Sequence, residues 1–462
     1  MSPILSGGEG AVDRESRAVS TAPVRESLAG EVLEAGQPGA DASEVSTVSL
    51  LRKLLGIGWT VGASVGTFGF FAIQGVILAR ILGPADRGVF AAAVLFPQAL
   101  LYPGMLGAPE LFASYAAQGA KNAELRRSAV VYGAFAGILT CLACVGLNWA
   151  TIPENMRHVL PWAMLCAATM PLQQIRFSVQ AVDHGQRRFK RYNTVRLAAA
   201  ATFPALLVIG WVLGLNSVPQ AAMLFVAAQV IALGLIQVGM PSSWIGERAV
   251  GLKRALSEAK GLMGAWWATE LLERLDLVLV MVLIANDRVL GFYAAAVPIA
   301  SLMIIVPNAA GLYAFNRGAR ESENLTPSDA WRFIGLGLGI QILCAAALAA
   351  VLPFLVPLFY GDDFSPTVHF AWLLLPAGIF RGLLQAADSY LRARKRPVAG
   401  IVARCVAIPV LLLISIGGQS SLGDASIPIG LSVAQGLCFV IVAAALLRDT
   451  RGRRSSIELA AQ

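Results

Sequence analysis

The fold is decided by the stretch DRGVFAAAV at residues 86–94, because a close copy, DRVLGFYAAAV, occupies residues 287–297. Gly88 aligns with Gly291 at an offset of 203 residues, each after an Asp-Arg pair and before an apolar run. A second alignment, at an offset of 205 residues, gives seven identities within 20 positions: Pro171/Pro376, Arg176/Arg381, Gln180/Gln385, Ala181/Ala386, Asp183/Asp388, Arg187/Arg392 and Lys190/Lys395. The chain therefore contains two copies of one unit.

The sequence around this repeat is too apolar for a soluble protein. Hydrophobic residues make up 56% of the 462 residues and charged residues 14%, whereas soluble domains carry about 25% charged residues. The mean hydropathy is +0.67. The apolar runs are continuous over roughly 20 residues, which predicts membrane-spanning helices rather than the alternating strands of a β-barrel. The six cysteines all lie in these runs, where they act as small apolar residues.

Twelve runs are long enough to cross a bilayer as helices, which satisfy their own backbone groups in lipid. Their approximate limits are 54–79, 88–108, 128–150, 159–181, 194–214, 219–240, 261–285, 289–313, 333–353, 366–390, 397–416 and 427–447. With the N-terminus in the cytoplasm, the cytoplasmic connectors and C-terminus hold 23 lysines and arginines, and the periplasmic connectors hold four. This asymmetry predicts cytoplasmic termini. It also accounts for the net charge of +8, so no nucleic-acid partner is expected.

The repeat offset covers six helices, an even number, so both copies have the same orientation in the membrane. The predicted fold is all-α and integral to the membrane, with twelve helices in two six-helix lobes related by a pseudo-twofold axis along the membrane normal. This layout is typical of transporters that bind their substrate between the halves. The predicted segments are a disordered acidic tail (1–48), two lobes (50–244 and 255–447) and a short basic tail (448–462).

Four arginines lie within predicted spans, where a charge is a functional hypothesis by default. In span four, Gln173, Arg176, Gln180 and Asp183 share one helical face, and Arg381, Gln385 and Asp388 repeat that face in span ten. We interpret both faces as lining a cavity between the lobes. The alternative is that the arginines snorkel or pair with the aspartates. The candidate substrate-binding residues are Gln173, Arg176, Gln180, Arg274, Arg381, Gln385 and Arg404.

Span seven carries Glu270, Glu273, Arg274 and Asp276 within two turns. The i, i+4 spacing predicts that Glu270 and Arg274 pair, which leaves two carboxylates that could be protonated or bind a coupling cation. The ion-coupling candidates are Glu270, Glu273, Asp276 and Asp388. We find no metal-ligand spacing, phosphate-binding glycine loop or Ser-His-Asp set, so neither an enzyme nor a cofactor is expected.

Residues 77–90, ILARILGPADRGVF, resemble the LAR-x-LG-x-x-x-x-G-x-[FY] signature of bacterial polysaccharide and O-antigen flippases. ERLD at 273–276, GFY at 291–293 and GDDF at 361–364 are similar to later motifs of that family. The resemblance implies the multidrug/oligosaccharidyl-lipid/polysaccharide exporter fold. It also implies an undecaprenyl-pyrophosphate-linked oligosaccharide substrate, flipped across the bacterial inner membrane, with polysaccharide polymerase and chain-length machinery as partners.

Other functions fit less well. A drug/cation antiporter of the same superfamily typically has an acidic residue in the first span, and residues 54–79 contain none. A lipid II flippase usually has two further helices. The major facilitator motif similar to GPADRG at 83–88 lies in a cytoplasmic connector, whereas this one lies in a periplasmic connector. A polymerase would need larger periplasmic connectors than the roughly ten residues present here.

Overall fold

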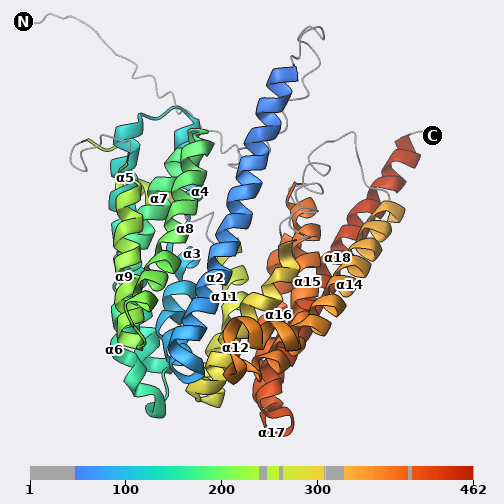
Figure 1. Ribbon diagram of the computed structural model, residues 1–462. Helices are drawn as coiled ribbons and strands as arrows, with labels where there is room; N and C mark the ends of the chain where they lie inside the picture. Colours follow the sequence, from blue (N-terminus) through green and yellow to red (C-terminus); the bar gives the residue numbers. More distant parts are fainter. Residues whose placement is uncertain are drawn as a thin grey trace, which may run out of the picture.

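The computed structural model describes residues 47–238, 247–259, 264–305, 307, 327–393 and 398–460. Over these ranges every regular element is a helix and none is a strand, which confirms the predicted all-α class (Figure 1). The predicted acidic tail lies outside the described residues except for its last two positions. Several basic residues of the predicted cytoplasmic connectors also lie outside them: Lys260, Arg317, Arg320, Arg394, Lys395 and Arg396.

The first half contains α2 (Thr47–Ala99), α3 (Leu101–Gly104), α4 (Ala108–Ala117), α5 (Asn122–Thr151), η3 (Glu154–Val159), α6 (Leu160–Ala167), α7 (Met170–Gly185), α8 (Phe189–Val212) and α9 (Val218–Leu235). The run α2 holds the first predicted span and most of the second. The two are separated at Gly83, whose backbone has φ 67° and ψ 178°, followed by Pro84. A left-handed φ is easily adopted by glycine alone, so this residue ends the first span.

The second half contains α11 (Gly264–Leu279), the π-helix η5 (Val280–Ile284), α12 (Asp287–Ser301), η6 (Leu302–Ile304), α14 (Pro327–Tyr360), η7 (Asp362–Phe364), α15 (Thr367–Ala393), α16 (Val398–Gly417), α17 (Gln419–Leu422), η8 (Gly423–Ala425) and α18 (Ser426–Ala460). A short amphipathic helix, α10 (Leu252–Ala259), lies in the connector between the halves.

Nine helical runs among the described residues are long and apolar enough to cross a membrane. One of them, Gly62–Ala117, contains two predicted spans. Predicted span four is divided into α6 and α7 around Ala168–Thr169, and predicted span seven is α11 with its charged residues and η5. The described residues of all twelve predicted spans are largely helical, which confirms the predicted fold class; parts of four spans, at 239–240, 261–263, 306, 308–313 and 397, lie outside the described residues.

Within the first half, α5 packs on α7 and α2 packs on α8; within the second, α15 and α16 both pack on α18. The main contact between the halves is that of α2 with α12. In Figure 1 the two groups of helices meet at the end where α12 lies and diverge towards the end where the C-terminus lies. The largest apolar cluster crosses the α2–α12 contact and includes Leu78, Ala92, Tyr293 and Ala296.

The closest approach between the halves is at the two repeat-related glycines. A Cβ atom on Gly88 would lie 1.7 Å from the carbonyl oxygen of Asp287, and one on Gly291 would lie 1.9 Å from that of Pro84. Only a hydrogen side chain fits at either position. Equivalent residues of two repeats meet where a twofold axis passes between them, so the pseudo-twofold axis runs through this crossing.

Three further sets of polar contacts join the halves at the same end. Arg80 donates hydrogen bonds from Nε to the Phe359 carbonyl (2.8 Å) and from Nη2 to the Leu358 carbonyl (2.5 Å), at the C-terminus of α14. Nε2 of His158 lies 3.2 Å from Oδ2 of Asp287. The Asn155 amide donates to the Ala285 carbonyl at 2.6 Å. These residues lie in or beside connectors that the charge distribution places in the periplasm. The halves are therefore held together at the predicted periplasmic end.

The connector helix α10 docks on the first half. The Tyr115 hydroxyl of α4 donates to Glu258, which also accepts a hydrogen bond from Nε of Arg254 at 2.8 Å. Just before the helix, the Val250 amide donates to Oγ of Ser128 at 3.1 Å. The two hydrogen bonds to Glu258 stabilise its carboxylate, chiefly the bond from Tyr115 and next the bond from Arg254, and they lower the pKa of Glu258.

The lowered pKa gives a pH dependence to this docking. A group whose pKa is lower in the docked state adds stability at neutral pH that is lost as the pH falls through the docked pKa. Because Glu258 is exposed, we expect less than about 1 kcal/mol. Hydrogen exchange of the α10 amides, corrected for its intrinsic pH dependence, should be faster in Glu258→Gln than in wild type at pH 7. The exchange rates of the variant and the wild type should become equal in acid. Equal exchange rates at pH 7 would contradict the prediction.

Candidate functional site

The halves meet a second time near the middle of the molecule, where α3 packs against α11. Tyr102 lies on α3, and Glu270 and Arg274 lie on α11, so this contact brings Tyr102 of the first half into electrostatic range of both charges of the second half. The Tyr102 ring also contacts Phe177, with ring centroids 6.1 Å apart. One arginine comes from each half, so the tyrosine lies in a charged region shared by both. We call Tyr102, Arg176, Glu270 and Arg274 the junction cluster.

In the first half, Arg176 is half-buried, and its guanidinium lies 4.5 Å from the centroid of the Phe177 ring. Its Nε atom has no hydrogen-bond partner, and it forms no ion pair with any residue of the described ranges. On the same face of α7, the buried Gln180 has an unpartnered Nε2. Gln173 differs, because its Nε2 donates to Oγ1 of Thr169 at 2.9 Å. The polar face of α7 therefore has hydrogen-bond donors without a described partner at Arg176 and Gln180.

In the second half, Arg381 is already paired. Its Nε donates to Oε1 of Glu273 at 3.0 Å, and a second contact joins its Nη2 to the same carboxylate. The carboxylate of Glu273 therefore bonds across to α15. The sequence predicts the same substrate-binding role for the repeat-related Arg176 and Arg381. Their charge environments in the structure differ, because a carboxylate pairs with Arg381. Gln385 is half-buried one turn further along α15.

The ion pair expected within α11 does not form. Glu270 and Arg274 feel each other's charge, but no direct ion pair joins them, and the carboxylate that is paired on this helix is that of Glu273. Glu270 is buried. Arg274 is half-buried and forms no ion pair with a described residue. Spacing along one helix could not reveal this, because the partner that binds Glu273 comes from α15.

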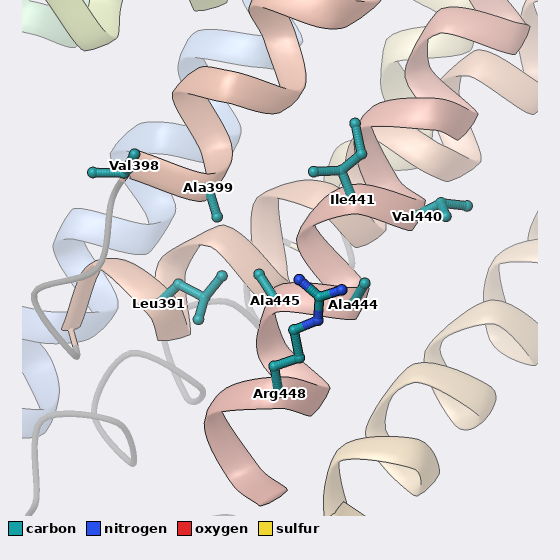
Figure 2. Close-up of a pocket in the computed structure, with 8 residues that line it drawn as sticks. All are labelled: Leu391, Val398, Ala399, Val440, Ile441, Ala444, Ala445 and Arg448. Atoms are coloured by element: carbon teal, nitrogen blue, oxygen red, sulfur yellow. The ribbon is translucent and has the colours of Figure 1, made fainter. Parts of the chain in front are cut away.

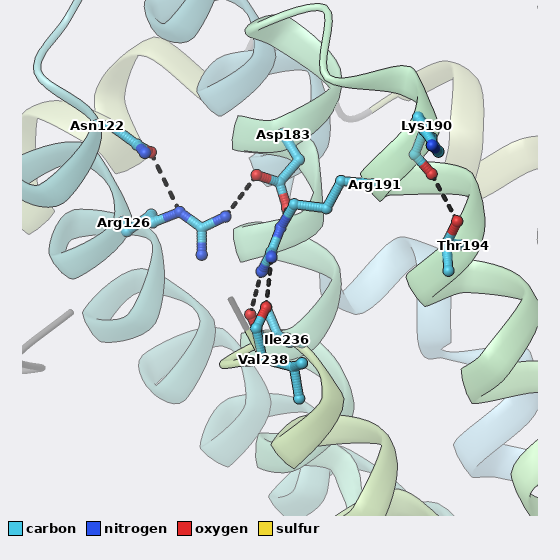
Figure 3. Close-up of polar contacts among 8 residues, drawn as sticks. All are labelled: Asn122, Arg126, Asp183, Lys190, Arg191, Thr194, Ile236 and Val238. Carbon is cyan, nitrogen blue, oxygen red and sulfur yellow. Dashed lines mark hydrogen bonds and ion pairs between the residues drawn. The ribbon is translucent and has the colours of Figure 1, made fainter. Parts of the chain in front are cut away.

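The two repeat-related aspartates lie in ion pairs within their own halves. Asp183 accepts hydrogen bonds from Arg126 at 2.5 Å and from Arg191 at 3.2 Å (Figure 3). Asp388 lies 3.4 Å from Nη2 of Arg404, whose Nη1 donates to the Gly400 carbonyl at 2.8 Å. Of the predicted site residues, Arg404 and Asp388 are therefore joined to each other.

A small cavity of about 40 Å³ lies inside the second half, among α11, α12, α15 and α18. Its polar lining is Glu273, Asp276, Ser301, Arg381 and Gln435. Asp276 accepts a hydrogen bond from the Tyr293 hydroxyl at 2.9 Å, while its Oδ1 and the Oε1 of Gln435 have no partner. Carboxylate and amide oxygens are ligands for hard cations. No group of three His, Cys, Asp or Glu residues that could hold a metal ion occurs in the described ranges.

Tyr102 is the one member of the junction cluster that is not among the residues predicted from the sequence. It precedes Pro103-Gly104 at the end of α3, where the second span is interrupted. A proline-glycine pair inside an apolar run marks such an interruption. Interrupted helices are frequent at transporter binding sites, so this pair was the available signal.

No protein-family model and no curated protein matches the chain. Solved structures do match it. An inward-facing multidrug resistance MATE family transporter of the MOP superfamily has a TM-score of 0.65 at 12% identity, covering 85% of this chain and 95% of its own. The lipid II flippase MurJ in an inward closed conformation has a TM-score of 0.68 at 10% identity, covering 84% of this chain and 87% of its own.

An outward-facing MATE family transporter of the MOP superfamily has a lower TM-score of 0.60, at 13% identity and with 87% and 95% of the two chains covered. At these identities the likeness shows the fold alone, which is that of MATE transporters and MurJ.

Proposed function

We propose that this protein is a flippase that moves an undecaprenyl-pyrophosphate-linked oligosaccharide from the cytoplasmic to the periplasmic leaflet of the inner membrane. The two halves, residues 50–244 and 255–447, would alternate access to a site between them. The observation that carries the proposal is the junction cluster, where Tyr102 and Arg176 both contact Phe177 in the first half and Arg274 lies on α11 of the second half, which packs on α3. Neither arginine is neutralised by an ion pair with a described residue. An anionic head group bound there would contact both halves at once.

The chemistry of the cluster suits a lipid pyrophosphate. Guanidinium groups bind phosphate oxygens through two parallel hydrogen bonds. The unpartnered amide of Gln180 can bind sugar hydroxyls. The lipid tail can remain in the bilayer, so only the head group needs the polar site. Moving about two negative charges outward gains on the order of 5 kcal/mol at 100 mV, inside negative.

The position of the contacts between the halves supports loading from the cytoplasm. The glycine crossing closes the predicted periplasmic end, and the ribbons diverge towards the other end (Figure 1). We infer from these contacts that the head group enters the site from the cytoplasmic leaflet. A flippase of this kind would supply a polysaccharide polymerase and its chain-length machinery.

A second candidate function is a drug/cation antiporter, favoured by the small cavity in the second half. Asp276 has one unpartnered oxygen there, while Glu273 is occupied by Arg381. Proton or cation binding at Asp276, with Glu270 and Asp388 as further candidates, would couple an ion gradient to transport. The arginines of the junction cluster, which pair with no described carboxylate, oppose a cationic drug at the central site. Drug efflux by the purified protein in vesicles, with no flipping of lipid-linked oligosaccharide, would support the antiporter.

Substitution of Arg176 tests the flippase. We expect Arg176→Ala to lower flipping about tenfold, the loss of one charge-assisted hydrogen bond, and Arg176→Lys to lower it less, because lysine keeps the charge but lacks the planar fork. The measurement is accumulation of lipid-linked oligosaccharide in the inner leaflet at matched protein levels. The exposed Arg332 provides the control, and Arg332→Ala should be silent. If arginine merely snorkels, Arg176→Lys will flip at the wild-type rate, which would reject the proposed role.

Orientation needs a separate test. A reporter that is active only in the cytoplasm should be active when fused after Arg196 and silent when fused after Asp287 or Asp363. The 23 against four distribution of lysines and arginines predicts this pattern. The reverse pattern would overturn both the orientation and the loading direction.

A further inference from the structure

The carboxylates of α11 outnumber the arginines that lie around them in the second half. Glu270, Glu273 and Asp276 follow one another at three-residue spacing, which places them on one side of the helix. Two arginines lie within electrostatic range of Glu270 and Asp276, namely Arg274 on the same helix and Arg381 on α15. Like charges about one turn apart on a helix repel each other. Withdrawal of either arginine therefore increases the excess of negative charge on this side of α11.

Arg381 is the arginine that a bound head group can draw away. It binds Glu273 through Nε at 3.0 Å and through a second contact from Nη2. The two side chains are 29% and 21% exposed, so an incoming group can reach both. Arg381 also lies within electrostatic range of Glu270, a member of the junction cluster. Guanidinium groups bind phosphate in the same bidentate way as carboxylate, so a pyrophosphate at the junction cluster competes with Glu273 for Arg381.

The elements that pack on α11 supply no second base for Glu273 among the described residues. Helix α16 carries Arg404, which is paired with Asp388. Helix α3 carries Tyr102, and Tyr293 of α12 donates its hydrogen bond to Asp276. Residues 54–79 of α2 contain no charged side chain. Once Arg381 withdraws, a proton is therefore the available source of positive charge.

The small cavity beside Glu273 is ready to receive a protonated carboxyl group. Two buried acceptors in its lining, Oδ1 of Asp276 and Oε1 of Gln435, have no donor. An ionised carboxylate only accepts hydrogen bonds, whereas a protonated one has an O–H donor. The cavity volume of about 40 Å³ also suffices for one water molecule, which can relay the bond. A proton on Glu273 therefore supplies the donor that these two acceptors lack.

The larger groove of the second half offers no comparable exchange. It has a volume of about 690 Å³ and lies among α15, α16 and α18, with seven apolar lining residues and the exposed Arg448 (Figure 2). Its lining contains no carboxylate, so an anion bound there would displace none. Arg448 therefore provides a control for arginine substitutions in the second half.

We propose that binding of the head group transfers Arg381 from Glu273 to the pyrophosphate and that Glu273 then takes up one proton. The proton is taken from solvent and adds to a carboxylate oxygen of Glu273; no other covalent bond forms or breaks. This exchange rests on the proposed flippase function and makes Arg381 a third arginine ligand of the phosphates, after Arg176 and Arg274. Proton uptake and substrate binding are linked, because both require the Arg381–Glu273 pair to open.

Proton uptake by the full chain, purified in detergent, provides the test. The probe is farnesyl-pyrophosphoryl-N-acetylglucosamine, whose two phosphates each have one strongly acidic group and stay ionised near neutral pH. Any proton taken up therefore goes to the protein. Titration calorimetry in two buffers that differ in ionisation enthalpy counts the protons. We expect uptake that approaches one proton per bound probe, and so an affinity that falls by up to about tenfold for each pH unit.

Variants assign the proton to its residue. Glu273→Gln keeps an acceptor for Arg381 but cannot bind a proton, so uptake should disappear and the affinity should become independent of pH. Arg381→Gln should also abolish uptake, and it should weaken probe binding about tenfold, the loss of one charge-assisted hydrogen bond. Arg448→Gln removes an exposed arginine of the groove and should leave proton uptake and affinity at their wild-type values.

The outcomes distinguish the exchange from the flippase function on which it rests. Binding of the probe by the wild type without proton uptake would overturn the exchange and leave the proposed function standing. Uptake that persists in Glu273→Gln would place the proton on another group and would also overturn the exchange. Absence of probe binding at every pH would contradict the proposed function itself, and the exchange with it.

Discussion

We expect Gly88→Val to abolish transport while the protein still reaches the membrane. The new Cβ would lie 1.7 Å from the carbonyl oxygen of Asp287, and this neighbour is backbone, which cannot rotate away. The crossing of α2 and α12 must therefore open, and the periplasmic contacts around it must separate. A carrier that cannot close this end cannot complete the alternation between its two open states. Gly291→Val should behave in the same way, because its Cβ meets the Pro84 carbonyl oxygen at 1.9 Å.

Transport is measured by inner-leaflet accumulation, and closure is measured independently of any substrate. His158 and Asp287 form an ion pair of 3.2 Å between the halves. Cysteines at these two positions, in a Cys405→Ser background, should be joined by a short thiol crosslinker when the end is closed. Gly88→Val should prevent this crosslink. Gly69→Val is the control, because that glycine also lies in α2 and has no atom within 4 Å of the Cβ position. Wild-type transport by Gly88→Val would contradict the prediction.

The polar contacts between the halves at this end are individually weak. Arg80 binds two carbonyls at the C-terminus of α14, where the helix dipole favours a cation, but its side chain is exposed. His158 is charged only when protonated, and it is also exposed. Exposed contacts of this kind contribute little to stability. Breaking these polar contacts therefore adds little to the free energy needed to open this end, whereas the close fit of the two glycines favours one arrangement of the closed state.

The sequence predicts the helical framework because spans and repeats are periodic signals. The repeat aligns Gly88 with Gly291, and the structure places these two residues in contact. Side-chain pairing across helices could not be predicted in the same way. Glu273 binds Arg381, 108 residues away, rather than a residue of its own helix. The internal symmetry also hides the difference between Arg381, which pairs with Glu273, and Arg176, which forms no ion pair with a described residue, because only three-dimensional packing brings Glu273 to one of them.

The largest effect on stability is expected at Asp183. This carboxylate is 1% exposed and binds Arg126, whose side chain is 5% exposed, at 2.5 Å. Removal of one partner from a buried ion pair leaves the other charge without compensation. Asp183→Ala should therefore lower the free energy of unfolding by about 3–5 kcal/mol. Denaturant unfolding of the purified protein in detergent measures the change. Glu154→Ala breaks an exposed ion pair with Arg157 and should change stability by less than about 1 kcal/mol.

A double variant separates the charge effect from packing. In Arg126→Leu/Asp183→Leu neither buried charge remains, so most of the lost stability should return. Arg191 retains its hydrogen bonds to the Ile236 and Val238 carbonyls, and its greater exposure lets water solvate the freed guanidinium (Figure 3). A double variant as unstable as Asp183→Ala would mean that the carboxylate acts through Arg191 instead. Near-wild-type stability of Asp183→Ala itself would show that Arg126 is solvated and that the pair does not hold α5 against α7.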